Sequence, residues 1–295
     1  MRILEWLKAL LYGIIEGITE WLPVSSTGHL ILVEDWLPFR FSKDPVFVAE
    51  FWEMFEVVIQ LGAILAVVIL FWDRLWPFSK KKSAEEKTRT WKLWLRVLIA
   101  SLPAAFAGIV LDKILEKATG KDINGWLYNS LVVAIMLIVY GVAFIVVEHF
   151  NAKREAKIKG TDEIGVKTAL GVGFFQTLSL IPGTSRSGST ILGAMLLGLN
   201  RTAGAEFSFF MSVPVMVGAG GIKVLGFFKY VSESNVTVPA DAWITLAIGC
   251  VVSFAVSLVA IRFLMDFVKK HSFAPFGIYR IALGALVLLL WLLKI

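Results

Sequence analysis

Two carboxylates stand inside an apolar stretch near the start of the chain. Glu16 and Glu20 are four residues apart, so any helix formed there presents both on one face. Carboxylates that close together either hold a divalent cation or repel each other until one takes up a proton. The alternative is a pair near the membrane interface that simply reaches water. Because ionisable groups inside apolar segments usually face a functional site, we expect Glu16 and Glu20 to face one, as candidate metal ligands or as a pair that takes up a proton.

The next polar residues, Ser25, Ser26, Thr27 and His29, follow Pro23. Taken alone, the run of hydroxyls is typical of a helix N-cap. His29 stands three residues after Ser26, which brings an imidazole within reach of a hydroxyl on a helix. A hydroxyl beside an imidazole is the minimum arrangement for an activated nucleophile. The spacing therefore predicts that Ser26 and His29 form such a pair, and that Ser25 and Thr27 beside them contact the substrate. The alternative is a plain helix N-cap, which has the same spacing.

A second polar stretch, Pro182-Gly-Thr-Ser-Arg-Ser-Gly-Ser-Thr190, lies past the middle of the chain. It combines helix breakers, five hydroxyls and the guanidinium of Arg186, and an apolar helix is expected to begin near Thr190. Backbone N–H groups at a helix start, together with an arginine, form a ready phosphate site. The alternative for Arg186 is a structural ion pair with Glu16, Glu20 or Glu206. The residues expected to bind substrate here are Gly183, Ser185, Ser187 and Thr190.

One apolar stretch carries a stripe of polar side chains at helical spacing. The stripe consists of Glu50, Glu53, Glu56 and Gln60. Glu56 and Gln60 lie deeper in the stretch, so we expect them to line an internal cavity, with Gln60 contacting substrate. In the second half of the chain, Glu206, Ser208 and Ser212 could have a related role, and serines that only pack helices together are the alternative.

The composition identifies the elements that must position these groups. The chain has 295 residues, of which 57% are hydrophobic and 18% are charged, whereas soluble domains average about 45–50% and about 25%. Several stretches of about 20 residues carry few charges, which is the length a helix needs to cross a bilayer. Cys250 is the only cysteine, which excludes a disulfide framework and a cysteine metal site. The basic residues form no nucleic-acid-binding module, so we expect no nucleic acid partner.

The sequence divides into eight apolar segments, and two of them are broken. The segments are 3–33, 46–72, 93–111, 126–147, 166–199, 206–228, 242–265 and 274–294. The breaks at Pro23 and Pro182 release backbone hydrogen bonds, which is tolerated at membrane depth only where protein or water satisfies them. An offset of 160 residues superposes Gly13 on Gly173, and Ser25 on Ser185. Broken segments at matching places in two halves are typical of an inverted repeat with a site at the membrane midplane.

We therefore expect an all-α integral membrane protein with six transmembrane helices and two re-entrant broken helices. It forms a single membrane domain, 1–295, whose repeat halves are about 1–150 and 160–295. Loop charges favour this topology, because one side then carries fourteen Lys and Arg residues and the other carries five. If all eight segments crossed, the split would be eleven against eight. The positive-inside rule makes the basic side cytoplasmic and places both termini outside.

These groups together suit phosphoryl transfer or hydrolysis, in which positioning and charge neutralisation provide most of the catalysis. In a membrane, the expected substrate has a phosphate head and a lipid tail. Lipid phosphatases of the acid-phosphatase type need two histidines, and no histidine follows Ser185-Arg186 in the same motif. A transporter or flippase for a lipid phosphate is the alternative, since inverted repeats with broken helices are common in transporters. Static binding needs no nucleophile, so Ser26 and His29 favour hydrolysis.

Two long motifs carry a resemblance to a known family. Glu16-Gly-Ile-Thr-Glu20-Trp-Leu-Pro-Val-Ser25-Ser26-Thr-Gly-His29 and Pro182-Gly-Thr-Ser-Arg186-Ser-Gly-Ser-Thr190 closely resemble the two signatures of the bacterial undecaprenyl-diphosphate phosphatases, the family linked to bacitracin resistance. Glu56-Val-Val-Ile-Gln60-Leu-Gly, Glu206-Phe-Ser-Phe and Pro275-Phe-Gly-Ile-Tyr-Arg280 are similar to family segments as well. The resemblance covers nearly the full chain.

The resemblance implies hydrolysis of undecaprenyl diphosphate to undecaprenyl phosphate and inorganic phosphate, which recycles the carrier lipid of peptidoglycan synthesis. It implies a multi-pass protein of the bacterial plasma membrane, surrounded by membrane lipids, that needs a divalent cation, Mg²⁺ or Ca²⁺. By the match, Glu16, Glu20, Ser26, His29 and Arg186 are functional positions. We expect Ser26 to attack the terminal phosphorus while His29 moves the proton, or His29 to prepare a water instead. Assembly into a homo-oligomer is compatible with the sequence and not decided by it.

Overall fold

The computed structural model describes residues 2–120, 123–152 and 154–293. This part of the chain is almost entirely helical and contains no strand; one isolated bridge pairs Ile158 with Leu199. In chain order, the elements are α1 (Arg2–Thr19), α2 (Ser26–Glu34), α3 (Pro45–Leu70), α4 (Trp72–Leu75), α5 (Ala84–Thr119), α6 (Ile123–Leu127), α7 (Ser130–Asn151), the 3₁₀ turn η1 (Thr161–Glu163), α8 (Val166–Thr177), the 3₁₀ turn η2 (Leu178–Leu180), α9 (Arg186–Leu196), α10 (Arg201–Ser234), α11 (Ala240–Lys270) and α12 (Ala274–Leu293).

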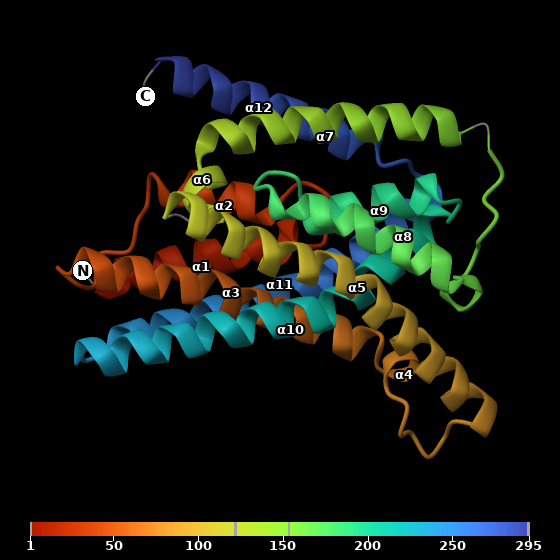
Figure 1. Ribbon diagram of the computed structural model, residues 1–295, viewed down its shortest axis with the longest axis horizontal. Helices are drawn as coiled ribbons and strands as arrows, with labels where there is room; N and C mark the ends of the chain where they lie inside the picture. The colour runs from red at the N-terminus through yellow and green to blue at the C-terminus, as the bar shows by residue number, and fades with distance from the viewer. Residues whose placement is uncertain (1, 121–122, 153, 294–295) are drawn as a thin grey trace.

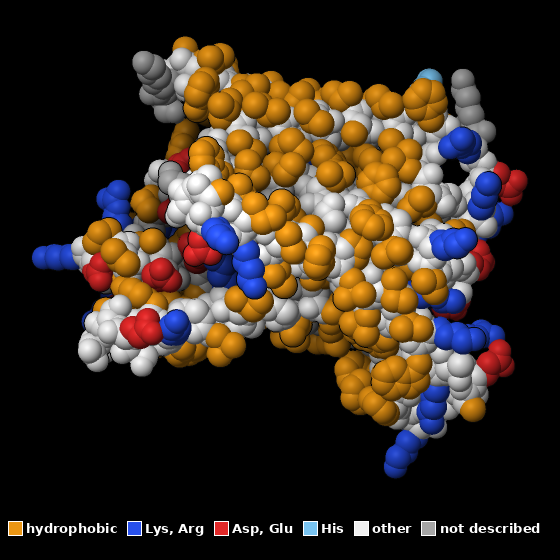
Figure 2. Space-filling model, in the orientation of Figure 1, with side chains coloured by type: hydrophobic (Ala, Val, Ile, Leu, Met, Phe, Trp, Pro, Cys, Tyr) orange, Lys and Arg blue, Asp and Glu red, His pale blue; other side chains and the backbone are white. Residues whose placement is uncertain are grey.

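Six of the described helices are long and apolar enough to cross a membrane: α3, α5, α7, α10, α11 and α12. They match the six unbroken apolar segments, whereas the broken segments 3–33 and 166–199 contain shorter helices. Hydrophobic side chains form a broad belt over the middle of the molecule, and charged side chains gather at its two ends (Figure 2). The prediction of an all-α membrane protein with six transmembrane helices is confirmed.

Several helices extend beyond the predicted apolar segments, and the starts of α5 and α9 show why. α5 extends well beyond the apolar segment 93–111, because a capping box starts it early: Ser83 Oγ accepts from the Glu86 N–H, and the Ser83 N–H donates to Glu86 Oε2. Half of the basic loop 73–92 is therefore helical. The helix expected to begin near Thr190 begins at Arg186, because Ser185 already supplies the cap. Hydrophobicity marks where a helix enters lipid, and side-chain caps decide where it starts.

Each broken segment ends at the side of the molecule where it begins (Figure 1). Arg2 in α1 pairs with Asp241, and Asp35, just after α2, accepts a hydrogen bond from Ser130 at that same side, where both termini lie. At the opposite side, the residues before α8 and after α9 are joined by a bond from Lys157 N to Gly198 O. Re-entrant segments require this geometry, and membrane re-entry itself stays a prediction, as does the cytoplasmic assignment of the basic side.

Two of the loop cations counted above, Lys121 and Lys153, lie outside the described residues.

Helix packing follows the pairings that a duplicated chain would give. α1 packs against α11 as α8 packs against α5, and α3 packs against α11 as α10 packs against α5. The glycines superposed by the 160-residue offset have equivalent roles: Gly13 lies against the carbonyl of Gly249 in α11, and Gly173 lies against that of Ala100 in α5. A Cβ at either position would collide with backbone. The repeat, its inversion and the single-domain division stay predictions that this packing supports.

Candidate active site

The candidate site forms at the N-termini of α2 and α9, the second helix of each broken segment. Ser25 caps α2 and Ser185 caps α9 in the same way, each hydroxyl accepting from the N–H three residues later, that of Gly28 at 3.2 Å and of Gly188 at 3.0 Å. Both serines have a positive φ, 76° and 72°, which is uncommon for a residue other than glycine. The N-cap reading of the first hydroxyl run is thus correct for Ser25. Two helix N-termini consequently face one region of the interior.

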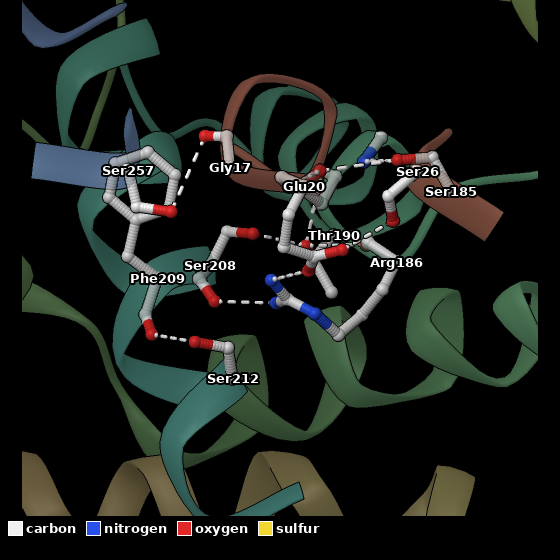
Figure 3. A network of polar contacts seen from close by, with 12 residues as sticks. Gly17, Glu20, Ser26, Ser185, Arg186, Thr190, Ser208, Phe209, Ser212 and Ser257 are labelled. Carbon is white, nitrogen blue, oxygen red and sulfur yellow. Dashed lines mark hydrogen bonds and ion pairs between the residues drawn. The ribbon is translucent and has the colours of Figure 1, made fainter. Parts of the chain in front are cut away.

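Glu20 is the residue at which the two polar stretches meet (Figure 3). It follows α1 and is only 5% exposed. Its Oε2 accepts a hydrogen bond from Ser26 Oγ at 2.5 Å, and its Oε1 accepts one from Arg186 Nη2 at 2.9 Å. Ser187 Oγ donates to the main-chain carbonyl of Glu20 at 3.0 Å. One carboxylate therefore holds a hydroxyl of the first stretch and a guanidinium of the second.

The predicted Ser26–His29 hydrogen bond is absent from the described contacts. His29 Nδ1 lies 2.7 Å from the Ser25 carbonyl and must donate to it, because a carbonyl only accepts. His29 Nε2 then accepts from the Tyr279 hydroxyl at 2.7 Å, and the two rings stack. The Ser26 hydroxyl donates to the Glu20 carboxylate instead, since a carboxylate is a strong acceptor. The catalytic role expected of His29 stays a prediction.

Arg186 is held on two sides. Besides Glu20, it donates from Nη1 to the main-chain carbonyl of Ser208 in α10 at 2.9 Å. Thr190 lies one helical turn later and shares a 2.6 Å hydrogen bond with the Ser208 hydroxyl. The alternative of a structural ion pair is realised in part, since Arg186 pairs with Glu20, while Glu206 pairs with Arg74 instead. An arginine fixed by both a carboxylate and a carbonyl keeps one orientation, which is what binding a phosphate group requires.

The remaining predicted substrate contacts divide into two groups. The hydroxyls of Ser185, Ser187 and Thr190 already make hydrogen bonds within the protein, so they hold the second loop in shape. Thr27 is half-buried on α2, and Gln60 is half-buried on α3; neither takes part in the described polar network around Glu20. Their contact with substrate stays a prediction.

Several buried polar atoms at this site lack a hydrogen-bond partner among the described residues. They are both carboxylate oxygens of Glu16, Nε of Arg186, the Thr184 hydroxyl and the side-chain amide of Gln176. Glu16 and Gln176 are also superposed by the 160-residue offset. Buried groups without partners are rare and usually indicate a bound water, ion or ligand. The carboxylate of Glu16 and the Nε donor of Arg186 are therefore available to a bound ion, water or ligand.

Arg280 joins the two broken segments; the sequence placed it in a family-like segment but gave it no role. It is fully buried in α12 and donates to the carbonyl of Pro23 at 2.9 Å. It also donates to the carbonyls of Gly183 and Thr184, at 2.6 and 2.9 Å. The neighbouring Tyr279 binds His29, so α12 contacts the first stretch twice. A single arginine in the apolar segment 274–294 was the available signal, because such charges usually mark a functional region.

Gly183 offers a test of how tightly the second loop is built. Its φ is +86°, and a Cβ there would lie 2.6 Å from the Val133 carbonyl. We expect Gly183→Ala to lower the free energy of unfolding by about 1–3 kcal/mol, through backbone strain and this collision. Gly218→Ala on α10 is the matched control, since no atom lies within 4 Å of its added Cβ. Thermal unfolding in detergent gives the midpoint temperature of each variant. Equal midpoints for the two variants would contradict the claim that the loop at Gly183 has no room for a Cβ.

Comparison with known proteins agrees with this geometry. The chain is 49% identical over 294 residues to the undecaprenyl-diphosphatase of Streptococcus gordonii, covering 100% of this chain and 98% of that protein. It is 51% identical over 285 residues to the undecaprenyl-diphosphatase of Enterococcus faecalis, covering 97% of each. The relative from Lactococcus lactis subsp. cremoris is 47% identical over 293 residues, again covering 97% of each. Residues 9–286 match the family described as Bacitracin resistance protein BacA, and the chain belongs to that family.

Proposed function

We propose that this protein hydrolyses undecaprenyl diphosphate to undecaprenyl phosphate and inorganic phosphate in the bacterial plasma membrane. The observation that carries the proposal is the Ser26 hydroxyl bonded to the Glu20 carboxylate, with Arg186 on the same carboxylate. The curated relatives named undecaprenyl-diphosphatase support it over nearly their whole length. The reaction returns the carrier lipid of peptidoglycan synthesis to its monophosphate form, and the family description names bacitracin resistance as the associated property.

The contacts of Glu20 suggest how the reaction proceeds. Glu20 takes the proton of Ser26 Oγ as that oxygen forms a bond to the terminal phosphorus, and the phosphoanhydride bond breaks to release undecaprenyl phosphate. Arg186 stabilises the negative charge on the phosphoryl oxygens, with Nε as the donor that no described residue occupies. Water then hydrolyses the phosphoserine and releases inorganic phosphate. In the alternative route, Glu20 deprotonates a water that attacks directly, and Ser26 only binds substrate.

Of the two carboxylates predicted to bind a divalent cation, Mg²⁺ or Ca²⁺, only that of Glu16 has oxygens free to do so. The two oxygens of Glu16 are buried without partners, whereas both oxygens of Glu20 already bind Ser26 and Arg186. No group of three or more His, Cys, Asp or Glu side chains suited to a metal lies in the described ranges. Mg²⁺ commonly takes one or two protein carboxylates and completes its shell with phosphate oxygens and water. Glu16 is therefore the proposed ligand, and the ion would neutralise charge on the transferred phosphate.

All of the proposed catalytic groups lie within one chain, and assembly into a homo-oligomer stays a prediction. A lipid diphosphate suits a site enclosed by membrane helices, because its tail can stay in the bilayer while its head enters the site. The lipid substrate and the membrane setting are consistent with the family.

Removing the metal is expected to stop the reaction. Purified protein incubated with undecaprenyl diphosphate should release inorganic phosphate, and a chelator should lower this release by at least about tenfold. Adding excess Mg²⁺ or Ca²⁺ should restore it. Chelator that leaves phosphate release unchanged would contradict the proposed metal. Absence of any phosphate release, combined with movement of polyprenyl phosphate across vesicles, would favour the transporter alternative instead.

A further inference from the structure

A second polar pocket lies at the basic side of the molecule, away from Glu20. It has a volume of about 590 Å³ and lies between two groups of residues: Asn151 at the end of α7 with residues 154–157, and residues 195–201 where α9 leads into α10. Arg186 is at the start of α9 and the pocket is at its end. An eleven-residue helix separates them by roughly 15 Å. The pocket is therefore distinct from the site around Glu20, and its role does not depend on the proposed hydrolysis.

The pocket walls are held in place by the backbone. The Gly198 carbonyl accepts hydrogen bonds from the N–H groups of Lys157 and Ile158, both at 3.0 Å. Asn200 N donates back to the Ile158 carbonyl at 2.9 Å, and Asn200 Oδ1 caps α10. Gly198 has a φ of +95°, and the stem of Lys157 lies against it. The loop after α7 is thus fastened to the α9–α10 turn, so the pocket is a built feature of the fold.

The charges on its walls do not cancel. Arg201 is neutralised by Glu148, which accepts from both its Nε and its Nη2, and Glu155 pairs with Lys159. Arg154 and Lys157 line the pocket, are exposed, and have no ion pair among the described contacts. Two cations with no acid partner leave the pocket positive. Figure 2 shows basic side chains gathered along this side of the molecule.

The same pocket has an apolar rim. Leu196 and Leu197 both line it, side by side, and are 44% and 38% exposed. In a membrane protein such residues face acyl chains. Cations above an apolar rim, at the boundary between bilayer and water, match a phosphate head above a lipid tail. We propose that the pocket formed by Asn151, residues 154–157 and residues 195–201 binds a phosphate group, which the exposed leucines indicate to be that of an anionic phospholipid.

The test is a comparison of two charge-reversed proteins. The pocket variant is Arg154→Glu with Lys157→Glu, and the control is Lys80→Glu with Lys81→Glu, which reverses two exposed charges on the same side outside the pocket. Native mass spectrometry after mixing with phosphatidylglycerol or phosphatidylcholine reports how much of each lipid stays bound. We expect the pocket variant to lose at least about tenfold of its phosphatidylglycerol affinity, since each cation near an anionic surface contributes about 1 kcal/mol. The control should change less than twofold.

Two further experiments distinguish a lipid phosphate from free phosphate as the ligand and test whether the pocket variant is folded. Inorganic phosphate, added to protein in neutral detergent, should shift the unfolding temperatures of wild type and pocket variant equally, because the site around Arg186 is the same in both. If it raises the unfolding temperature of wild type and not that of the pocket variant, free phosphate is the ligand and the lipid assignment is overturned. If the pocket variant and the control lose equal phosphatidylglycerol affinity, the effect is due to general surface charge, and the proposed binding site is wrong. Arg154→Gln with Lys157→Gln, which adds no new charge, should lose phosphatidylglycerol affinity while its unfolding temperature matches wild type.

Discussion

Replacing Glu20 with glutamine is expected to lower phosphate release at saturating substrate by about a thousandfold. Glutamine keeps the size of the side chain and one carbonyl oxygen, but it cannot take the proton of Ser26. It also removes the negative charge that pairs with Arg186 at 2.9 Å in a buried setting. Leaving a buried guanidinium without its carboxylate is costly, so the orientation of Arg186 should loosen as well. Steady-state assays with undecaprenyl diphosphate measure kcat and KM separately.

Glu85→Gln is the control for this change. Glu85 lies on the exposed start of α5 and pairs with Arg89, so its replacement removes a surface ion pair with little expected effect on rate. Unfolding temperatures of both variants establish that each protein is folded. A folded Glu20→Gln protein that turns over within tenfold of wild type would contradict the role of Glu20 as the base.

Replacing Arg280 with methionine is expected to lower kcat by about a hundredfold, although Arg280 is not proposed to touch substrate. Its guanidinium holds the carbonyls of Pro23, Gly183 and Thr184, which belong to the two loops that carry the site. It also lies over the ring of Tyr140, with 5.4 Å between guanidinium carbon and ring centroid. Without it, three buried carbonyls lose a donor, at about 1–3 kcal/mol each, and the loops are free to separate. Arg280 is in this sense a positioning residue.

Its control separates positioning from general stability. Arg262→Met removes an exposed arginine from the neighbouring helix α11 and should leave kcat near wild type. Arg280→Lys keeps one charge and three donors, so it should recover part of the lost kcat. A fall in unfolding temperature for Arg280→Met with kcat and KM unchanged would show that the residue only stabilises the fold. Recovery by lysine would not be expected in that case.

Much of the architecture is present in local sequence. Six helices followed from apolar length, and the two breaks followed from Pro23 and Pro182, because those signals act within a single segment. Helix ends were less well predicted, since the early start of α5 depends on the hydroxyl of Ser83 and not on hydrophobicity. The sequence also indicated that the two stretches belong together, through the shared offset and matching breaks.

The pairing of side chains inside the site was harder to predict. Ser26 was assigned to His29 because those residues are neighbours along one helix, whereas its acceptor, Glu20, lies across the break. His29 instead contacts Tyr279, which is 250 positions away. Contacts of this kind depend on how α12 packs against both loops, and spacing along the chain carries no information about that packing. The role of Arg280 was missed for the same reason, although its lone charge was visible.

The most direct test of the account is the turnover of Ser26→Ala. This change removes only the hydroxyl bonded to Glu20 and leaves the carboxylate paired with Arg186. Phosphate release from undecaprenyl diphosphate at saturating substrate is the measurement, with the unfolding temperature as the check on folding. If Ser26 attacks the terminal phosphorus, the rate should fall by at least about a thousandfold. Turnover near that of wild type would contradict the serine nucleophile and leave only the route in which Glu20 activates water.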